Sequence, residues 1–346
     1  MGLYLGSTKI PTISFYKQGG IMPSGIFTIP STSGTYDVTS YAFANGDFGY
    51  GRLSERVSGD LTEYSNSTAT SIASLAFAYT NIVSVSMPNV TTIGSSAFSA
   101  CRSLLEANFP SCVSIYNDAF SNCFNLTAIN FPVCTSLRSG NFYGCSKLTS
   151  ANFPLVTSIE GYYTLAYCTS LESISFPKLE VLSGGYNFYQ CYKLSSVYLP
   201  SCTAINATQA FYATGLGSVN LPKCSYISAG TFSYCSKLSN VSLPLCEVLS
   251  NTAFCQCSSL YVLSLPKCSF IGSQTFRSCY NLLSLYLTNS TVCSLSHINA
   301  FDSTPISTYT TSTGGVYGSI YVPAGLLATY KTATNWTTYS DRMVGI

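Results

Sequence analysis

Charged residues are scarce in this sequence. Only 8% of the 346 residues are charged, against roughly 25% in ordinary soluble proteins, and the formal net charge is +2. The chain therefore lacks both the basic footprint that nucleic-acid binding requires and an acidic tail. Its solubility must depend on uncharged polar side chains, chiefly serine, threonine, asparagine and tyrosine.

Long apolar segments are missing as well. No apolar run approaches the ~20 residues of a transmembrane helix, although 47% of the residues are hydrophobic. Residues 1–10 also lack the basic and apolar segments of a secretory signal. We therefore predict no membrane insertion, synthesis in the cytoplasm, and a final location on a virion or at an extracellular surface. A mature fragment of a longer precursor is an alternative.

Catalytic constellations are scarce too. Histidine occurs once, at His297, so every Ser–His or Cys–His scheme would have to use that residue. Carboxylates are scattered, and only Glu160 and Glu180 have positions that could form the close pair of a glycosidase. P-loop, Rossmann and HExxH motifs do not occur. The sequence predicts a protein that is not an enzyme and that has no cofactor and no metal site.

What the sequence does contain is a repeat of 22 or 23 residues. Proline recurs at Pro88, Pro110, Pro132, Pro154, Pro177, Pro200, Pro222, Pro244 and Pro266. Twelve residues before most of these prolines stands a phenylalanine, namely Phe98, Phe120, Phe142, Phe188, Phe232, Phe254 and Phe276. A period of this size predicts a solenoid, in which each coil buries its apolar side against its neighbours.

Each unit divides into three short segments. Alternating apolar residues before proline, as in Leu238, Val241 and Leu243, predict a half-buried strand that proline ends. A second apolar position, as at Ile93, predicts another extended segment, and the A-F-x-x-C piece predicts a tight helical turn on the opposite side. Successive strands about 4.8 Å apart would form a parallel sheet.

This pattern resembles the BspA-like leucine-rich repeat family over residues 72–302. The segment 101–120 carries the motif, and the motif recurs unit after unit. The resemblance implies a right-handed β-solenoid of stacked leucine-rich-repeat coils that serves adhesion or recognition without catalysis. Residues 303–346 look like the closing segment of such proteins, a strand followed by a short helix. We expect Leu326, Leu327, Tyr330 and Trp336 to cover the last coil there.

Residues 1–71 lack the period and are predicted to form an N-terminal β module. The segment Leu3–Ile10 resembles the opening strand of structural proteins from phages and prophages of gut bacteria. Six charged residues between Asp47 and Glu63 form either a solvated loop or a docking surface. This region is our candidate for attachment to other virion proteins, and a homo-oligomer is left open.

The sixteen cysteines fall into two ladders. The first follows Ala-Phe and comprises Cys101, Cys123, Cys145, Cys168, Cys191, Cys235, Cys257 and Cys279. The second stands two residues after proline and comprises Cys112, Cys134, Cys202, Cys224, Cys246 and Cys268, while Cys255 and Cys293 lie off both. Because Thr, Val or Leu replaces cysteine in neighbouring units, we interpret these positions as small buried packing sites.

Two surfaces are candidates for binding. On the strands, outward rows contain Asn108, Asn130, Asn152, Asn220, Tyr198 and Tyr286, a mixture typical of antibody paratopes; the alternative is that these rows merely hydrate the sheet. In the two longer coils, Tyr162, Tyr163, Tyr167, Tyr186, Tyr189 and Tyr192 crowd around the insertions Gly161 and Gly184–Gly185. We expect the extra residues to bulge at a turn, where binding residues tend to lie.

These observations predict a recognition protein that presents a Tyr/Asn/Ser-rich repeat surface to a cell-surface glycan or protein. The first setting is a phage or prophage virion, as a tail-associated component. The alternatives are a bacterial cell-surface adhesin and a structural subunit of a fibre or shell.

Overall fold

The computed structural model describes residues 63–65, 67, 69–307 and 317–346, together with four two-residue strands near the N-terminus. These are β1 (Tyr4–Leu5), β2 (Thr8–Lys9), β3 (Tyr16–Lys17) and β4 (Gly20–Ile21). They pair as two antiparallel hairpins, β1 with β2 and β3 with β4. The rest of the predicted N-terminal module, with its charged segment from Asp47 to Asp60, lies outside the described residues.

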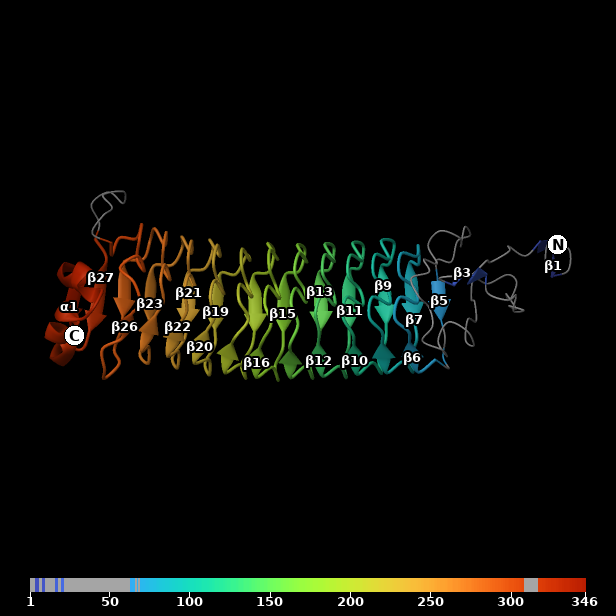
Figure 1. The fold of residues 1–346 in the computed structure, drawn as a ribbon, viewed down its shortest axis with the longest axis horizontal. Helices are drawn as coiled ribbons and strands as arrows, with labels where there is room; N and C mark the ends of the chain where they lie inside the picture. The colour runs from blue at the N-terminus through green and yellow to red at the C-terminus, as the bar shows by residue number, and fades with distance from the viewer. Residues whose placement is uncertain are drawn as a thin grey trace.

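The predicted solenoid of stacked parallel strands is confirmed (Figure 1). One side of each coil is a three-residue strand: β5 (Glu63–Ser65), β7 (Ser84–Ser86), β9 (Glu106–Asn108), β11 (Ala128–Asn130), β13 (Ser150–Asn152), β15 (Ser173–Ser175), β17 (Ser196–Tyr198), β19 (Ser218–Asn220), β21 (Asn240–Ser242), β23 (Val262–Ser264) and β25 (Ser284–Tyr286). A second side is a two-residue strand: β6 (Ser71–Ile72), β8 (Thr92–Ile93), β10 (Ser114–Ile115), β12 (Ser136–Leu137), β14 (Ser158–Ile159), β16 (Val181–Leu182), β18 (Ala204–Ile205), β20 (Tyr226–Ile227), β22 (Val248–Leu249), β24 (Phe270–Ile271) and β26 (Ser294–Leu295). The two-residue strands form one continuous 11-stranded parallel sheet.

The strands alternate between core and solvent as the sequence predicts. In β11, Ile129 is buried between the exposed Ala128 and Asn130. Parallel pairing places Asn130 opposite Asn108 on one side and Asn152 on the other. Equivalent residues of successive coils therefore stand in rows along the solenoid, and each row faces either the core or the solvent.

Two columns of phenylalanine rings fill the core. Phe98 and Phe120, from the Ala-Phe segments, stack with ring centroids 5.0 Å apart. Phe109 and Phe131, which end the strands, stack at 6.2 Å, and the two columns meet in tilted contacts such as Phe109–Phe120 at 6.1 Å. All of these rings are completely buried. Parallel strand pairing sets neighbouring coils about 5 Å apart, which is close enough for rings of successive coils to stack.

The third side of each coil is a six-residue turn, and here the prediction of a helical turn is wrong. Within residues 69–307 the structure has no helix. Instead, Ser96 and Ala100, the first and fifth residues of one such turn, adopt left-handed backbone angles with φ of 54° and 56°. Alternate N–H groups then donate to the next coil, as from Phe98 to Ala119 O (2.7 Å), whereas a helix would direct its N–H groups to its own carbonyls.

Both cysteine ladders are buried, as predicted, but their thiols also donate hydrogen bonds. In the first ladder each sulfur donates to a backbone carbonyl of the preceding coil, as Cys123 does to Phe98 O at 3.1 Å. In the second ladder the sulfur donates within its own coil, as Cys134 does to Ser136 O at 3.2 Å. Threonine suits the first ladder because its hydroxyl is also a small buried donor, although Thr80 donates within its own coil, to Phe77 O at 2.8 Å.

Cys293 corrects a further prediction, because it does not stand apart from the ladders. Its sulfur lies 3.7 Å from the Cys268 sulfur, at the end of the second ladder. Cys268 and Cys293 lie on adjacent coils, whose strands β24 and β26 pair directly. Cys293 follows the proline place by more than two residues because its coil has extra residues there, but its sulfur still reaches the ladder. Cys255, in contrast, is off both ladders and only partly buried.

The C-terminal segment covers the last coil with polar as well as apolar contacts. It comprises β27 (Ser319–Val322), the 3-10 helix η2 (Ala324–Leu326), α1 (Leu327–Thr332), the 3-10 helix η3 (Trp336–Arg342) and β28 (Met343–Gly345). The Trp336 indole N–H donates to Cys293 O at 2.6 Å, and the Tyr330 hydroxyl accepts from Cys293 N at 2.9 Å. These bonds satisfy backbone groups that a following coil would otherwise bind.

The glycine insertions of the longer coils do not bulge outward as expected. Gly161 and Gly185 are buried, and Gly185 forms parallel bridges with Tyr162 and Thr208 of the coils on either side. A Cβ atom at Gly161 would lie 2.0 Å from the backbone nitrogen of Ser139. The insertions thus extend the coil-to-coil stacking, and glycine is required because two backbones approach each other closely.

We predict that Gly161→Ala destabilises the protein by about 3 kcal/mol, because the new methyl group would overlap backbone atoms that cannot move independently. The matched control is Gly217→Ala, since a Cβ atom there meets nothing within 4 Å. Urea unfolding followed by circular dichroism measures both. Equal unfolding midpoints for the two variants would contradict this account.

We also predict that one thiol per native chain reacts with a maleimide at pH 8, namely Cys255. Burial raises the pKa of Cys145 to about 12, and complete burial also blocks access to its sulfur. Raising the pH should therefore speed the reaction at Cys255, by increasing its thiolate fraction, without adding sites. Mass spectrometry should count one adduct in the native protein, none in Cys255→Ser and sixteen after denaturation; rapid labelling of several thiols would refute the prediction.

A candidate recognition surface along the turn edge

The six-residue turns stack into one continuous edge of the solenoid, which we call the turn edge. In each turn the second, third and sixth residues are buried, as are Asn187, Phe188 and Cys191. The first, fourth and fifth residues face outward, as do Tyr186 and Tyr189. The two left-handed residues per turn produce this alternation, so the outward positions form three rows along the edge.

Seven tyrosines occupy these outward positions on neighbouring turns and touch one another. We call them the tyrosine cluster: Tyr143, Tyr163, Tyr167, Tyr186, Tyr189, Tyr212 and Tyr234. Tyr163 stacks on Tyr186 at 4.8 Å and Tyr189 stacks on Tyr212 at 4.7 Å, with interplanar angles of 11° in both pairs. Edge contacts join the pairs, such as Tyr186–Tyr189 at 5.6 Å. The cluster is one aromatic surface fixed to a hydrogen-bonded backbone.

Three phenol groups of the cluster, those of Tyr163, Tyr167 and Tyr212, have a pKa raised above the ordinary value of tyrosine. Burial raises the pKa of Tyr163, and the nearby Tyr186 and Tyr143 hydroxyls raise it further. The same two causes raise the pKa of Tyr212, whose neighbours are Tyr234 and Tyr189. The surface therefore offers hydroxyl donors and aromatic faces without negative charge.

The structure places the two sets of predicted binding residues on different sides of the solenoid. Tyr163, Tyr167, Tyr186 and Tyr189 belong to the tyrosine cluster, while Tyr162 and Tyr192 are exposed beside it. Tyr198 lies in β17 on the strand face, away from the turns, in the same row as Asn108, Asn130, Asn152, Asn220 and Tyr286. Sequence reasoning missed Tyr143, Tyr212 and Tyr234, although the place of each within its turn was a signal that could have found them.

The strand-face residues engage mainly one another. Asn152 Nδ2 donates to Asn130 Oδ1 at 2.9 Å, and Asn108 Nδ2 donates to Ser86 Oγ at 3.2 Å. Tyr286 stacks on Tyr321 at 4.4 Å. Side chains already paired along the row have fewer groups left for a ligand.

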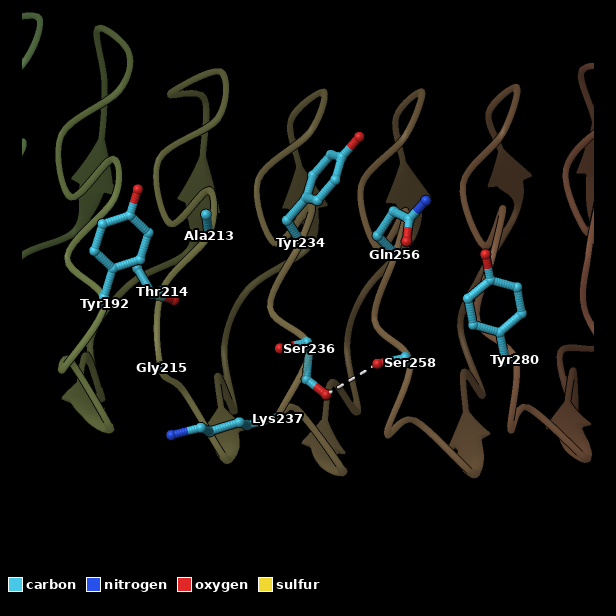
Figure 2. Close-up of a pocket in the computed structure, with 10 residues that line it drawn as sticks. All are labelled: Tyr192, Ala213, Thr214, Gly215, Tyr234, Ser236, Lys237, Gln256, Ser258 and Tyr280. Carbon is cyan, nitrogen blue, oxygen red and sulfur yellow. Dashed lines mark hydrogen bonds between the residues drawn. The ribbon is translucent and has the colours of Figure 1, made fainter.

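A hollow of about 450 Å³ opens on the turn edge directly after the tyrosine cluster (Figure 2). Its lining includes Tyr192, Gly215, Tyr234, Lys237 and Tyr280. Its cause is a missing residue: Phe211 and Phe232 are 21 residues apart instead of 22, and the turn at Gly215 is short and has no side chain. The three rings stand on alternate coils, and Figure 2 shows Ala213 on the coil between Tyr192 and Tyr234 and Ser258 on the coil between Tyr234 and Tyr280.

The carboxylates that could have formed a catalytic pair are not brought together. Pairing of Ser158 with Val181 and of Ile159 with Leu182 places Glu160 after one strand and Glu180 before the other. The two exposed side chains therefore lie at opposite ends of a strand pair. His297 Nδ1 accepts a hydrogen bond from Asn299 N at 3.1 Å. Nowhere in the described residues do three or more His, Cys, Asp or Glu residues form a group that could hold a metal ion.

A family model described as "BspA type Leucine rich repeat region (6 copies)" matches residues 70–184 and 182–308. The chain belongs to the BspA-type leucine-rich repeat family. The two matched segments together cover more than half of the sequence and contain both the tyrosine cluster and the hollow. No curated protein matches this BspA-type chain.

Solved leucine-rich repeat structures resemble this BspA-type protein. A leucine-rich repeat protein from Bacteroides ovatus is 25% identical, with a TM-score of 0.66 over 80% of this chain and 69% of the other. A leucine rich cell surface protein from Faecalibacterium prausnitzii is 18% identical, with a TM-score of 0.42 over 98% of this chain and 97% of the other. In the part of the chain that the structure describes, no helix is long and apolar enough to cross a membrane.

Proposed function

We propose that this protein is a non-catalytic recognition protein that binds a cell-surface partner through its turn edge. The tyrosine cluster is the observation that carries the proposal. Tyrosine combines a large apolar face with a hydroxyl donor and loses little conformational entropy on binding, which is why it recurs at binding sites. Stacking between coils has already fixed the rings of Tyr163, Tyr186, Tyr189 and Tyr212, so a partner would meet a preorganised surface.

The strand face is the rival surface, and its hydrogen bonding argues against it. Asn152 donates to Asn130 along the row, and Asn108 donates to Ser86 of the neighbouring coil. A ladder of this kind hydrates and stabilises the sheet, and this role requires no binding partner. The turn edge, in contrast, presents exposed rings beside a hollow that has polar groups in its lining.

A binding role without catalysis accords with the chemistry of the described residues. Glu160 and Glu180 are separated, and the matched family is one of structural repeats. A rigid solenoid can present many weak contacts in a line. That arrangement suits recognition of an extended surface better than transformation of a small substrate.

The setting of this recognition is a second part of the proposal. We place the protein at an extracellular surface, either as a bacterial adhesin or as a tail-associated virion component that residues 1–71 attach to the particle. A subunit of a fibre or shell is the structural alternative. The attachment region lies almost entirely outside the described residues, so its assembly state has to be measured.

We predict that the double substitution Tyr189→Ser and Tyr212→Ser weakens binding to intact bacterial or epithelial cells by at least tenfold, because it removes the stacked centre of the cluster. Serine stands at the same turn position in Ser121 and Ser233, so the fold should tolerate it. The control is Tyr198→Ser with Tyr286→Ser on the strand face, where Ser242 and Ser264 occupy the same row. Flow cytometry with labelled protein measures the unsubstituted protein and both variants; a loss confined to the control would refute the proposal.

For the virion setting we predict a defined oligomer of the full chain and a monomer for a variant that begins at Ser71. Light scattering of both proteins in solution gives their masses. Homo-oligomers usually assemble with closed symmetry, and in this proposal a module in residues 1–71 holds the subunits together. Monomers in both cases would remove this support and favour a free-standing adhesin.

A further inference from the structure

A row of basic side chains runs along the turn edge with a period of two coils. Its members are Arg102, Lys147, Lys193 and Lys237, which stand one or two residues after the cysteine that closes a turn; we call them the basic row. All four are exposed. The coil between each pair carries an uncharged residue at the matching place, such as Asn125 or Ser170.

Hydrogen bonds show that the coils are stacked in register along this row. Asn125 Nδ2 donates to Arg102 O at 2.7 Å, Lys147 N donates to Phe124 O at 3.2 Å, and Ser259 Oγ donates to Ser236 O at 2.6 Å. Neighbouring coils are about 5 Å apart, so successive cations are separated by about 10 Å. A ligand that used all four cations would have to be a chain that lies along the solenoid axis.

Exposed aromatic rings accompany the basic row. Phe124, Tyr192 and Tyr280 occupy the place directly after the cysteine, and all three are exposed. Arg102 lies over the Phe124 ring with its guanidinium carbon 5.6 Å from the centroid. Between Tyr192 and Tyr280 the row passes the hollow, whose lining contains Lys237 and Gln256 (Figure 2). Flat rings, amide groups and hydroxyls suit pyranose rings, which combine apolar faces with hydrogen-bonding hydroxyls.

The spacing matches one kind of polymer. In an extended β-linked pyranose chain each sugar advances by about the thickness of one coil, so a disaccharide spans two coils. We propose that the basic row binds a linear acidic glycan that carries one carboxylate in every disaccharide. Each carboxylate pairs with one cation of the row, the rings of Tyr192 and Tyr280 stack on sugar faces, and a ring substituent enters the hollow.

Charge density argues against more highly charged polyanions. Glu172 is exposed and lies on the coil between Lys147 and Lys193, only a few residues from the row. Its carboxylate would repel a ligand that carried a negative charge at every coil, as a nucleic acid or a sulfated glycan does. A ligand with a charge at every second coil carries no charge at the Glu172 coil, and on the coils that it does use the exposed carboxylate nearest the row is Glu106, four residues after Arg102.

A second lysine row shows that the two-coil period alone does not make a site. Lys178, Lys223 and Lys267 follow proline on alternate coils, at a different edge. Glu180 and Glu247 each stand three residues after the proline of their coil, which is two residues beyond the place that the lysines occupy. Negative charge therefore accompanies this second row. Repulsion between like charges on adjacent coils explains why lysines skip a coil in both rows, but it does not explain the exposed rings beside the basic row.

The inference rests on the proposed use of the turn edge in recognition, and glycan binding in solution tests it separately. The probes are hyaluronan and unsulfated chondroitin oligosaccharides, which carry one carboxylate per disaccharide. Calorimetry should show affinity that rises with length up to about eight sugars, the span of the basic row. Neutral chitin oligosaccharides and polyglutamate should bind at least tenfold more weakly.

Matched variants locate the site. Lys147→Ser, Lys193→Ser and Lys237→Ser combined should weaken hyaluronan binding about tenfold or more, and serine already stands at this place in Ser170 and Ser259. The control combines Lys178→Ser, Lys223→Ser and Lys267→Ser, removes the same charge and should change nothing. Tyr192→Ser with Tyr280→Ser should weaken binding to a similar degree, because stacking is lost.

Three outcomes would overturn the inference. Equal loss in both lysine variants, or equal binding of polyglutamate, would show that net charge attracts any polyanion, including an acidic protein segment. Absence of binding to both carboxylated glycans would exclude the proposed ligand class. If the tyrosine-cluster variant still lost cell binding in that last case, the proposed recognition function would stand without the glycan.

Discussion

Backbone hydrogen bonds between successive coils are the constraint on which the rest of this structure depends. They run through the three-residue strands, the two-residue strands and the turns, as in the bond from Phe98 N to Ala119 O. Because these bonds hold successive coils in register, every side chain stands about 5 Å from its counterparts in the coils before and after. The protein is therefore a set of parallel rows, and each row has to satisfy one environment along its whole length.

This constraint explains the composition of the core and the surface together. A buried row must stack on itself, which flat phenylalanine rings do well, as Phe188 and Phe211 show at 5.0 Å. A buried row that meets backbone carbonyls needs a small donor, and cysteine and threonine both supply one. On the surface, like charges in adjacent places of one row would lie about 5 Å apart and repel each other. Scarce charge, often placed on alternate coils, is the expected consequence.

The sequence alone predicts most of the fold, because the rows are visible in its period. Proline, leucine and phenylalanine spacing locates the strands and the core columns, while the covering role of Tyr330 and Trp336 was expected from the resemblance of residues 303–346 to a closing segment. The turns were misjudged because Ala-Phe-x-x-Cys places apolar residues at helical spacing. Their left-handed positions are filled by residues such as Ser96 and Ala100, which give no local signal, and glycine appears there in only a few units, as at Gly140 and Gly144.

The candidate site was harder to predict, since it depends on departures from the period. Tyrosine density located the centre of the cluster, but Tyr143, Tyr212 and Tyr234 join it only when each turn is read as a set of outward positions. The hollow was invisible because its missing residue at Gly215 is offset by an extra residue before Phe211, so Pro200 and Pro222 keep the usual spacing of 22. A deletion hidden in this way leaves the stacking intact and alters the surface alone. Such compensated changes let a repeat protein acquire a specific contact surface while its hydrogen-bonded scaffold remains the same.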